Sequence, residues 1–340
     1  MNFNTQILLS NISSKVMLLD SYDFTIQNYT LGKFFWTLVF QGGKQMNKNL
    51  LLCLILGLLV SLPSWSCDQD GTTGIVEDNN LWISKDAKSI STVTEEEFNS
   101  ILDRIEELYT PIIEEFSATL KVNRNWSDGT VNAYARQLGS TWEISMFGGL
   151  ARHETITADA FALVACHELG HHIGGAPKKS SWYGGSMWAS NEGQSDYWGA
   201  MKCMKRYMEN DDNIAIVSAM EIDEHAKATC EANYNTENDI AICIRGAMAG
   251  LSLGNLFRAL RRSETPLLFT TPDPNVVTRT NDSHPAPQCR LDTYFAGSVC
   301  SRGYDEVVSQ SEANQGTCNR NENYESGLRP LCWYAETASN

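Results

Sequence analysis

The sequence has ten cysteines, but no two of them are separated by only two residues. Zinc ribbons take their ligands from such closely spaced pairs, so a metal site of that kind is not supported. Basic residues are also few, because 26 lysines and arginines stand against 41 acidic residues and give a net charge of −15. A surface of this sign does not attract nucleic acid or anionic lipid, so we expect no nucleic-acid partner. The sequence shows no internal repeat and no apolar run beyond the N-terminal region that predicts a transmembrane span.

One short apolar run, over 50–62, follows Lys48 and precedes small residues. This pattern predicts a secretory signal peptide over 46–66. The run is shorter than the roughly 18–20 residues of a membrane helix, so cleavage is favoured over a membrane span. Cys67 directly after the cut also fits lipoprotein processing, although Trp65 is bulky where such signals prefer small residues, and a lipid anchor at Cys67 stays open. We therefore expect an exported protein that is periplasmic, envelope-associated or secreted.

The region before the signal peptide, residues 1–45, lies upstream of the expected start at Met46 and is excluded from the mature protein. Removal of residues 1–66 takes away four lysines and two aspartates and leaves a net charge of −17. The polar residues 67–91 are expected to form a flexible lead-in.

Eight cysteines remain after Cys67, and an even number in an exported chain indicates disulfides. Proximity in the sequence suggests the pairs Cys230–Cys243, Cys289–Cys300 and Cys318–Cys332, which leaves Cys166 and Cys203.

Hydrophobic periodicity outlines the elements of the mature chain. A helix begins at Thr94, where Thr94 and Glu97 form a capping box, and its apolar residues recur at three- and four-residue steps to Phe116. We further expect strands over 118–122, 131–135 and 142–147, a hairpin turn at 127–129, helices over 157–173, 192–208, 215–231 and 237–262, and loops over 176–190 and 263–300.

A metal-binding pattern lies on two of these helices. His167 and His171 are the ends of an HExxH motif, so their imidazoles lie one turn apart on one helix face and can bind a single Zn²⁺. Glu168 lies about 100° round the helix, where it can take a proton from a water but is badly placed to be a ligand. Glu192 is the predicted third ligand, which leaves a fourth position open. Asp196 lies on the same face as Glu192 and is predicted to hold the outer nitrogen of His167.

This HExxH followed by NExxSD resembles the gluzincin zinc metallopeptidases, the thermolysin-like superfamily whose third zinc ligand is a glutamate. The gap between the two motifs is short, as in thermolysin, whereas other segments are similar to the HtpX- and BepA-type peptidases. The likeness covers about residues 92–205 and 284–290. The segments similar to the HtpX and BepA types are Asn132-Ala133-Tyr134-Ala135, Trp142-Glu143-Ile144-Ser145-Met146, Gly148-Gly149-Leu150 and Ser283-His284-Pro285 with Arg290.

The resemblance implies an α+β fold. Its zincin-like catalytic core, residues 92–210, would hold a small mixed sheet, the HExxH helix and an antiparallel ligand helix. Residues 211–340 would form a disulfide-rich, mostly helical and loop-rich C-terminal region that completes the cleft. Two arrangements of this region stay open, namely helices that close the far side of the cleft or a small disulfide-tied cap.

The resemblance also assigns roles around the metal. His284, with Arg290, would donate to the oxyanion of the transition state, and Tyr197 is a weaker rival donor. A loop histidine before proline without a catalytic role is the alternative for His284. The strand from Trp142 to Met146, including Ile144, would be the sheet edge to which a peptide substrate adds, or else a buried strand without substrate contact.

Two functional hypotheses follow. The first is an exported zinc metallopeptidase, with one Zn²⁺ per chain, that acts as an endopeptidase on peptide or unfolded-protein substrates, with a zinc-activated water and Glu168 as general base. The second is a non-catalytic binding or chaperone-like envelope protein on the same fold. A third possibility is a zymogen kept shut by the cysteine-rich C-terminal region.

Overall fold

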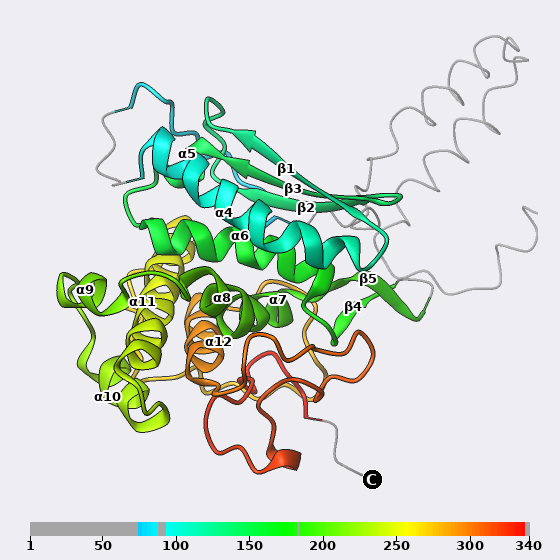
Figure 1. The fold of residues 1–340 in the computed structure, drawn as a ribbon, viewed down its shortest axis with the longest axis vertical. Helices are drawn as coiled ribbons and strands as arrows, with labels where there is room; N and C mark the ends of the chain where they lie inside the picture. Colours follow the sequence, from blue (N-terminus) through cyan, green and yellow to red (C-terminus); the bar gives the residue numbers. More distant parts are fainter. Residues whose placement is uncertain (1–73, 88–92, 182–183, 337–340) are drawn as a thin grey trace, which may run out of the picture. The chain divides into compact units, whose positions relative to one another are not determined.

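The computed structural model describes residues 74–87, 93–181 and 184–336, which form a mixed α+β unit with small sheets and several helices (Figure 1). The predicted signal peptide, the residues before it and the possible anchor at Cys67 lie outside the described residues. α6 (Ala158–Ile173) runs between the sheet and the C-terminal helices, and the rest of the fold is arranged around it.

The N-terminal helix of the described chain, α4 (Glu95–Glu114), forms as predicted. The Thr94 hydroxyl accepts from the Glu97 amide at 3.2 Å and satisfies one of the free donors of the first turn. The apolar face of α4 packs against α6 and β1 (Thr119–Asn125). Its buried residues are Phe98, Ile101, Leu102, Ile105, Tyr109 and Ile113.

The main sheet has the strand order β1-β3-β2. β3 (Thr141–Phe147) is parallel to β1 and antiparallel to β2 (Ala133–Leu138). The predicted hairpin at 127–129 between β1 and β2 is therefore wrong, because these strands do not pair. The hairpin joins β2 to β3 instead, and Gly139, with φ of 60°, supplies the left-handed conformation that its two-residue turn needs.

This order also corrects the predicted substrate edge. β3 has a partner on each side, so the strand that holds Trp142 and Ile144 is the centre of the described sheet. Its backbone groups are used by β1 and β2 and cannot bind an added strand. Ile144 is fully buried in the core, whereas Trp142 lies between the rings of Phe116 and His172.

α6 and the helical stretch after it position the centre of the molecule. The Thr157 hydroxyl caps α6 by accepting from Ala160, and both faces of the helix are buried, as in a core helix. The predicted helix over 192–208 is present as a continuous stretch. It consists of α7 (Glu192–Trp198), a π-helical turn (Gly199–Cys203) and α8 (Met204–Met208).

The second half of the chain differs from its prediction in three places. The loop over 176–190 contains a small hairpin, and the helix over 215–231 is interrupted where Asp223 caps a new helix. The region 263–300, predicted as loop, contains α12, which begins at Pro287, a residue that suits the first helical position. The remaining elements are β4 (Lys178–Ser180), β5 (Ser186–Ser190), α9 (Asn213–Ser218), α10 (Glu224–Asn233), α11 (Glu237–Leu260), α12 (Pro287–Val299) and the 3₁₀ turn Arg320–Glu322.

α11 is long and apolar enough to cross a membrane by length and composition, but 67% of its apolar window is buried inside the protein. It packs against α6, α9, α10 and α12, so its apolar residues serve as core contacts.

Part of the predicted lead-in packs on the fold. Ile75 is fully buried, and Gly74 and Trp82 make antiparallel bridges to Tyr134 and Thr130. Its polar composition gave no indication of this packing.

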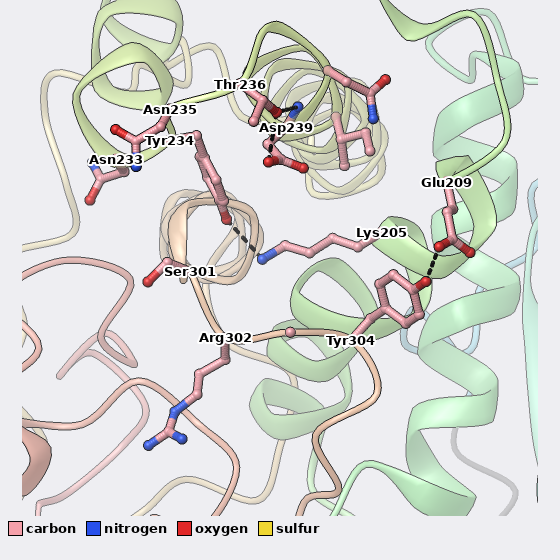
Figure 2. A pocket seen from close by; sticks show the side chains of 13 residues that line it. Lys205, Glu209, Asn233, Tyr234, Asn235, Thr236, Asp239, Ser301, Arg302 and Tyr304 are labelled. Carbon is pink, nitrogen blue, oxygen red and sulfur yellow. Dashed lines mark hydrogen bonds between the residues drawn. The ribbon is translucent and has the colours of Figure 1, made fainter.

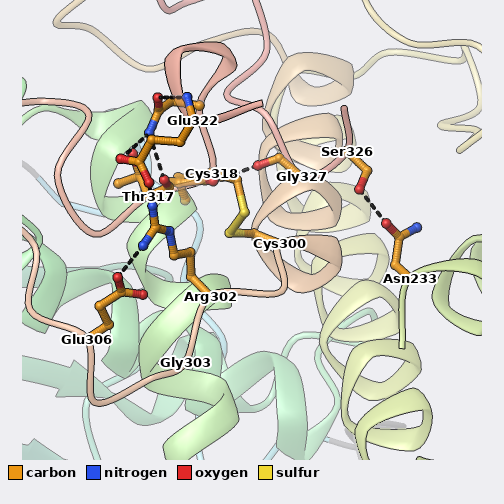
Figure 3. Close-up of a disulfide and its surroundings, with 12 residues drawn as sticks. Asn233, Cys300, Arg302, Gly303, Glu306, Thr317, Cys318, Glu322, Ser326 and Gly327 are labelled. Atoms are coloured by element: carbon orange, nitrogen blue, oxygen red, sulfur yellow. Dashed lines mark hydrogen bonds and ion pairs between the residues drawn. A yellow bond between two sulfur atoms is a disulfide. The ribbon is translucent and has the colours of Figure 1, made fainter. Parts of the chain in front are cut away.

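Four disulfides tie the described part of the chain, which suggests an oxidising, exported environment. Cys166–Cys203 and Cys230–Cys243 agree with prediction. The pairs Cys289–Cys300 and Cys318–Cys332 are wrong, because Cys289 and Cys300 lie near opposite ends of α12. Eleven helical steps of about 1.5 Å place them about 16 Å apart, far beyond the roughly 7 Å limit for a disulfide. The observed bonds are Cys289–Cys332 and Cys300–Cys318, and Figure 3 shows the second joining the end of α12 to the C-terminal loop.

Removal of the Cys166–Cys203 bond tests how much this disulfide contributes to the free energy of unfolding. This bond closes a loop with a sequence separation of 37, whereas Cys230–Cys243 closes one of 13. Chain entropy then predicts a loss of about 4 kcal/mol for the double variant C166A/C203A and about 3 kcal/mol for C230A/C243A. Urea unfolding of both variants and wild type measures the two losses. A smaller loss for C166A/C203A than for C230A/C243A would contradict this ranking.

Candidate metal centre

Three side chains from two helices converge on one point. α6 carries His167 and His171 one turn apart, and Glu192 is the first residue of α7. Asn191 caps α7, because its side chain accepts a hydrogen bond from the Gln194 amide at 2.9 Å. One donor atom from each of the three side chains lies within 4.8 Å of the others, and all three residues are buried. This group could hold a metal ion.

The buried atoms of the cluster that lack hydrogen bonds fit a bound metal ion. The Nε2 atoms of His167 and His171 have no hydrogen-bond partner among the described residues, and the two oxygens of Glu192 have ion-pair contacts but no hydrogen bond. Almost all buried polar atoms in folded proteins are hydrogen-bonded, so four atoms without a hydrogen bond that face one another need an explanation. A divalent cation bound by two imidazoles and a carboxylate would satisfy these groups together.

The outer nitrogens of the two histidines are fixed by hydrogen bonds. His167 Nδ1 lies 2.7 Å from Asp196 Oδ1, the contact that the sequence predicts. His171 Nδ1 lies 2.9 Å from the Ser190 carbonyl oxygen, and Ser195 Oγ is 3.0 Å away. Because the carboxylate and the carbonyl can only accept, each Nδ1 carries a hydrogen and each Nε2 is the nitrogen that faces the cluster, where it would lose any proton on binding a metal.

Asp196 is itself held by α12. Arg290 donates from Nε and Nη2 to its two oxygens at 2.8 and 2.7 Å, and the Tyr294 hydroxyl donates to it at 2.5 Å. Burial alone would raise the pKa of Asp196, but Arg290 and then His167 lower it below its usual range. Asp196 therefore stays ionised, and Asp196 together with Glu192 raises the pKa of the His167 imidazole to about 9 against the effect of burial.

Glu168 lies beside the cluster with nothing bonded to it. Both of its carboxylate oxygens are buried and have no hydrogen-bond partner within the described chain. Burial raises the pKa of Glu168 to about 8, although the nearby His167 charge opposes this. A carboxylate with a raised pKa that is not a ligand is suited to accept and release a proton near neutral pH.

His284 reaches the cluster from the loop before α12. Its Nε2 lies 3.3 Å from Glu192 Oε2 and 2.8 Å from the Gly74 carbonyl oxygen. Both neighbours are acceptors, so Nε2 carries the hydrogen. Burial lowers the pKa of His284 even though Glu192 raises it, which favours the neutral donor.

Sequence reasoning missed Lys179. Its Nζ lies 2.9 Å from Glu192 Oε1, and its side chain is buried. Lys179 belongs to β4, in a segment predicted as loop, and no motif surrounds it. The alternating pattern over 178–180 is too short to predict the strand that places the Lys179 ammonium beside the Glu192 carboxylate.

Three predicted site residues are not part of the cluster, namely Tyr197, Ile144 and Trp142, which packs between Phe116 and His172. Tyr197 is fully buried, and its hydroxyl donates to the Gly327 carbonyl oxygen at 2.6 Å, so the prediction of a rival donor is wrong. It lies one residue after Asp196 and thus points about 100° away from it round α7. Ile144 belongs to the core, as described above.

A pocket of about 520 Å³ lies away from the candidate metal centre (Figure 2). Lys205 crosses it and donates to the Tyr234 hydroxyl at 2.8 Å and to the Cys300 carbonyl. The carbonyl contact caps the end of α12. Burial lowers the pKa of Lys205 to about 7. The pocket is lined by residues of α8, α10, α11 and the loop 301–304.

No protein-family model, curated protein or solved structure matches this chain.

The Asp196 contact predicts a change in metal affinity. D196N removes the charged acceptor of His167 Nδ1, so the affinity for Zn²⁺ should fall about 10- to 100-fold. Competition with a chromophoric chelator measures this affinity. Asp103→Asn is the matched control, because Asp103 is exposed on α4 and pairs only at the surface with Arg124. Equal affinities for D196N and wild type would show that this hydrogen bond does not support the metal ligands.

The Lys205 contact predicts a pH dependence of stability. The unfolded chain binds a proton at Lys205 up to a pKa of about 10.4, whereas the folded chain releases it near pH 7. Between these values the unfolded state binds more protons, so the free energy of unfolding should rise as the pH is raised from 7 to 10. Urea unfolding at several pH values should show a weaker rise for Lys205→Met. Equal slopes for variant and wild type would contradict the assignment.

Proposed function

We propose that this chain is an exported zinc-dependent metallopeptidase of the gluzincin type. The observation that carries the proposal is the convergence of His167, His171 and Glu192 with an unbonded, buried Glu168 beside them. Two imidazoles and one carboxylate are a donor set of catalytic zinc, which takes three protein ligands and keeps one position open.

Zn²⁺ is the ion that this donor set favours, since imidazole nitrogen and a single carboxylate suit it better than Mg²⁺ or Ca²⁺. When bound there, the ion would polarise a substrate carbonyl and lower the pKa of a water.

The protein groups around it supply the proton transfers. Glu168 accepts a proton from the attacking water and passes it to the nitrogen of the leaving amine. The Nε2–H of His284 donates to the carbonyl oxygen as negative charge develops on it. Asp196 and Arg290 keep His167 in its metal-binding tautomer and orientation.

The substrate would be a peptide that adds to the open edge of β2. Such addition uses main-chain hydrogen bonds and tolerates varied side chains. β2 is an outer strand of the described sheet and packs against α6, which carries the histidines. This assignment replaces β3, whose backbone is already paired on both sides.

The alternative is a binding or chaperone-like protein that keeps the metal for shape. A structural metal site needs no buried carboxylate without partners, because such a group costs free energy and holds nothing. Glu168 therefore favours catalysis over a purely structural metal.

Replacement of Glu168 tests this choice. E168Q keeps the shape and the three ligands, so the protein should still bind one Zn²⁺ but hydrolyse peptides about 10²–10⁴-fold more slowly. Metal analysis and kcat/KM on a peptide library measure the two effects. Glu107→Gln, on the exposed face of α4, is the control. If wild type and E168Q bind zinc and are equally inert, the binding-protein hypothesis replaces the peptidase.

A further inference from the structure

The segment that begins at Gly74 occupies part of the open edge of β2. Gly74 makes an antiparallel bridge to Tyr134, and the Ile75 amide donates to the Ala133 carbonyl oxygen at 3.1 Å. The Asn132 side chain holds the next residue in both directions, because its Nδ2 donates to Val76 O at 3.1 Å and its Oδ1 accepts from Val76 N at 3.3 Å. The chain thus binds its own extended segment through main-chain groups, as an added peptide would be bound.

The same segment presents one peptide bond to the metal centre. The carbonyl oxygen of Gly74 accepts from His284 Nε2 at 2.8 Å, and this nitrogen lies 3.3 Å from the metal-ligand carboxylate of Glu192. The next carbonyl, of Ile75, accepts from Arg290 Nη1 at 2.5 Å. The Gly74–Ile75 bond therefore has the proposed oxyanion donor on its own carbonyl and the Arg290 guanidinium on the carbonyl of the next residue.

The side chains at this bond are restricted by their surroundings. A Cβ on residue 74 would lie 2.3 Å from Asn132 Oδ1 and 2.7 Å from Ala133 O, so only glycine fits. Ile75 is fully buried in the main apolar cluster, and Val76 is nearly so. The site therefore takes glycine before the bond and a branched aliphatic residue after it.

We propose that the Gly74–Ile75 peptide bond is a substrate of this chain's own metal centre, and that Gly-Ile and similar Gly-aliphatic bonds are its preferred substrates. The inference rests on the proposed peptidase function. In the reaction, the water oxygen bonds to the Gly74 carbonyl carbon and the bond from this carbon to the Ile75 nitrogen breaks. Glu168 takes the proton of the water and delivers it to that nitrogen. The products are a carboxylate on Gly74 and a chain that begins Ile75-Val76-Glu77.

A permanent structural strand is the competing explanation for this segment. It accounts for the bridges to β2. It does not account for the hydrogen bond from His284, which also faces Glu192, to the Gly74 carbonyl oxygen. It predicts that the bond stays intact in the active protein, so the two explanations differ in one measurable product.

The first experiment follows the N-terminus of the full chain. Wild type and E168Q are produced with Zn²⁺, and intact mass and N-terminal sequencing are compared, with hydrolysis of a peptide library measured alongside. The proposal expects wild type to begin at Ile75 and E168Q to keep the residues before it. Cleavage of E168Q at the same bond would point to another protease and overturn the proposal.

Self-cleavage at Gly74–Ile75 and the proposed peptidase function are contradicted by different results. Wild type that hydrolyses library peptides but keeps the residues before Ile75 would overturn self-cleavage and leave the peptidase function standing. Wild type that binds zinc and cleaves neither itself nor any peptide would overturn both.

A second experiment uses added peptides and does not depend on folding of a variant. A peptide of residues 70–79 should be cut between Gly74 and Ile75, and Gly74→Val or Ile75→Asp in the peptide should lower kcat/KM at least about tenfold. Asp78→Asn is the control, because Asp78 is exposed in the structure. Equal rates for all four peptides, or cleavage at other bonds, would overturn the assigned specificity.

Discussion

The buried ion pair between Asp196 and Arg290 is the interaction on which the metal centre depends. It joins α7, which carries the candidate ligand Glu192, to α12 of the C-terminal region. Phe257 of α11 lies 3.8 Å below the guanidinium, and the disulfide at Cys289 fixes the neighbouring residue. Removing one partner of such a pair typically costs about 3–5 kcal/mol, because the other charge is left buried. The C-terminal region is therefore part of the site, since it orients His167 through Asp196.

Charge around Glu192 is balanced in a similar way. This carboxylate faces His167, His171, Lys179 and His284 within 3.8 Å. These neighbours lower the pKa of Glu192 well below its usual value although burial acts in the opposite direction. An ionised carboxylate in a fully buried site is thus maintained by donors from three separate segments, α6, β4 and the loop before α12. Two of these donors, Lys179 and His284, are not among the three proposed metal ligands and face Glu192 in the structure.

The parts of this structure that follow from local rules could be predicted from the sequence. The N-cap at Thr94 and the α6 helix depend on spacing within one helix, where side-chain directions are fixed. The His167–Asp196 contact followed from the four-residue step that puts Asp196 on the same face of α7 as Glu192. The strand order could not be predicted, because β1 pairs with β3, which is not the next strand in the sequence. The turn residues at 127–129 indicated instead a hairpin between β1 and β2. α12 was predicted as a loop because of the prolines around it. Without that helix the sequence did not show that Cys289 and Cys300 lie too far apart to pair with each other.

The π-helical turn at Gly199–Cys203 makes the helix after Glu192 sensitive to chain length. In such a turn one extra residue is accommodated between two regular helical stretches. Cys203, its last residue, meets Cys166 of α6, the neighbour of a metal ligand. Loss of a single residue here would turn the following helix by about 100° and carry that sulfur away from its partner. Among relatives of this chain, insertions and deletions should thus be tolerated in the loops between helices but not within these five residues.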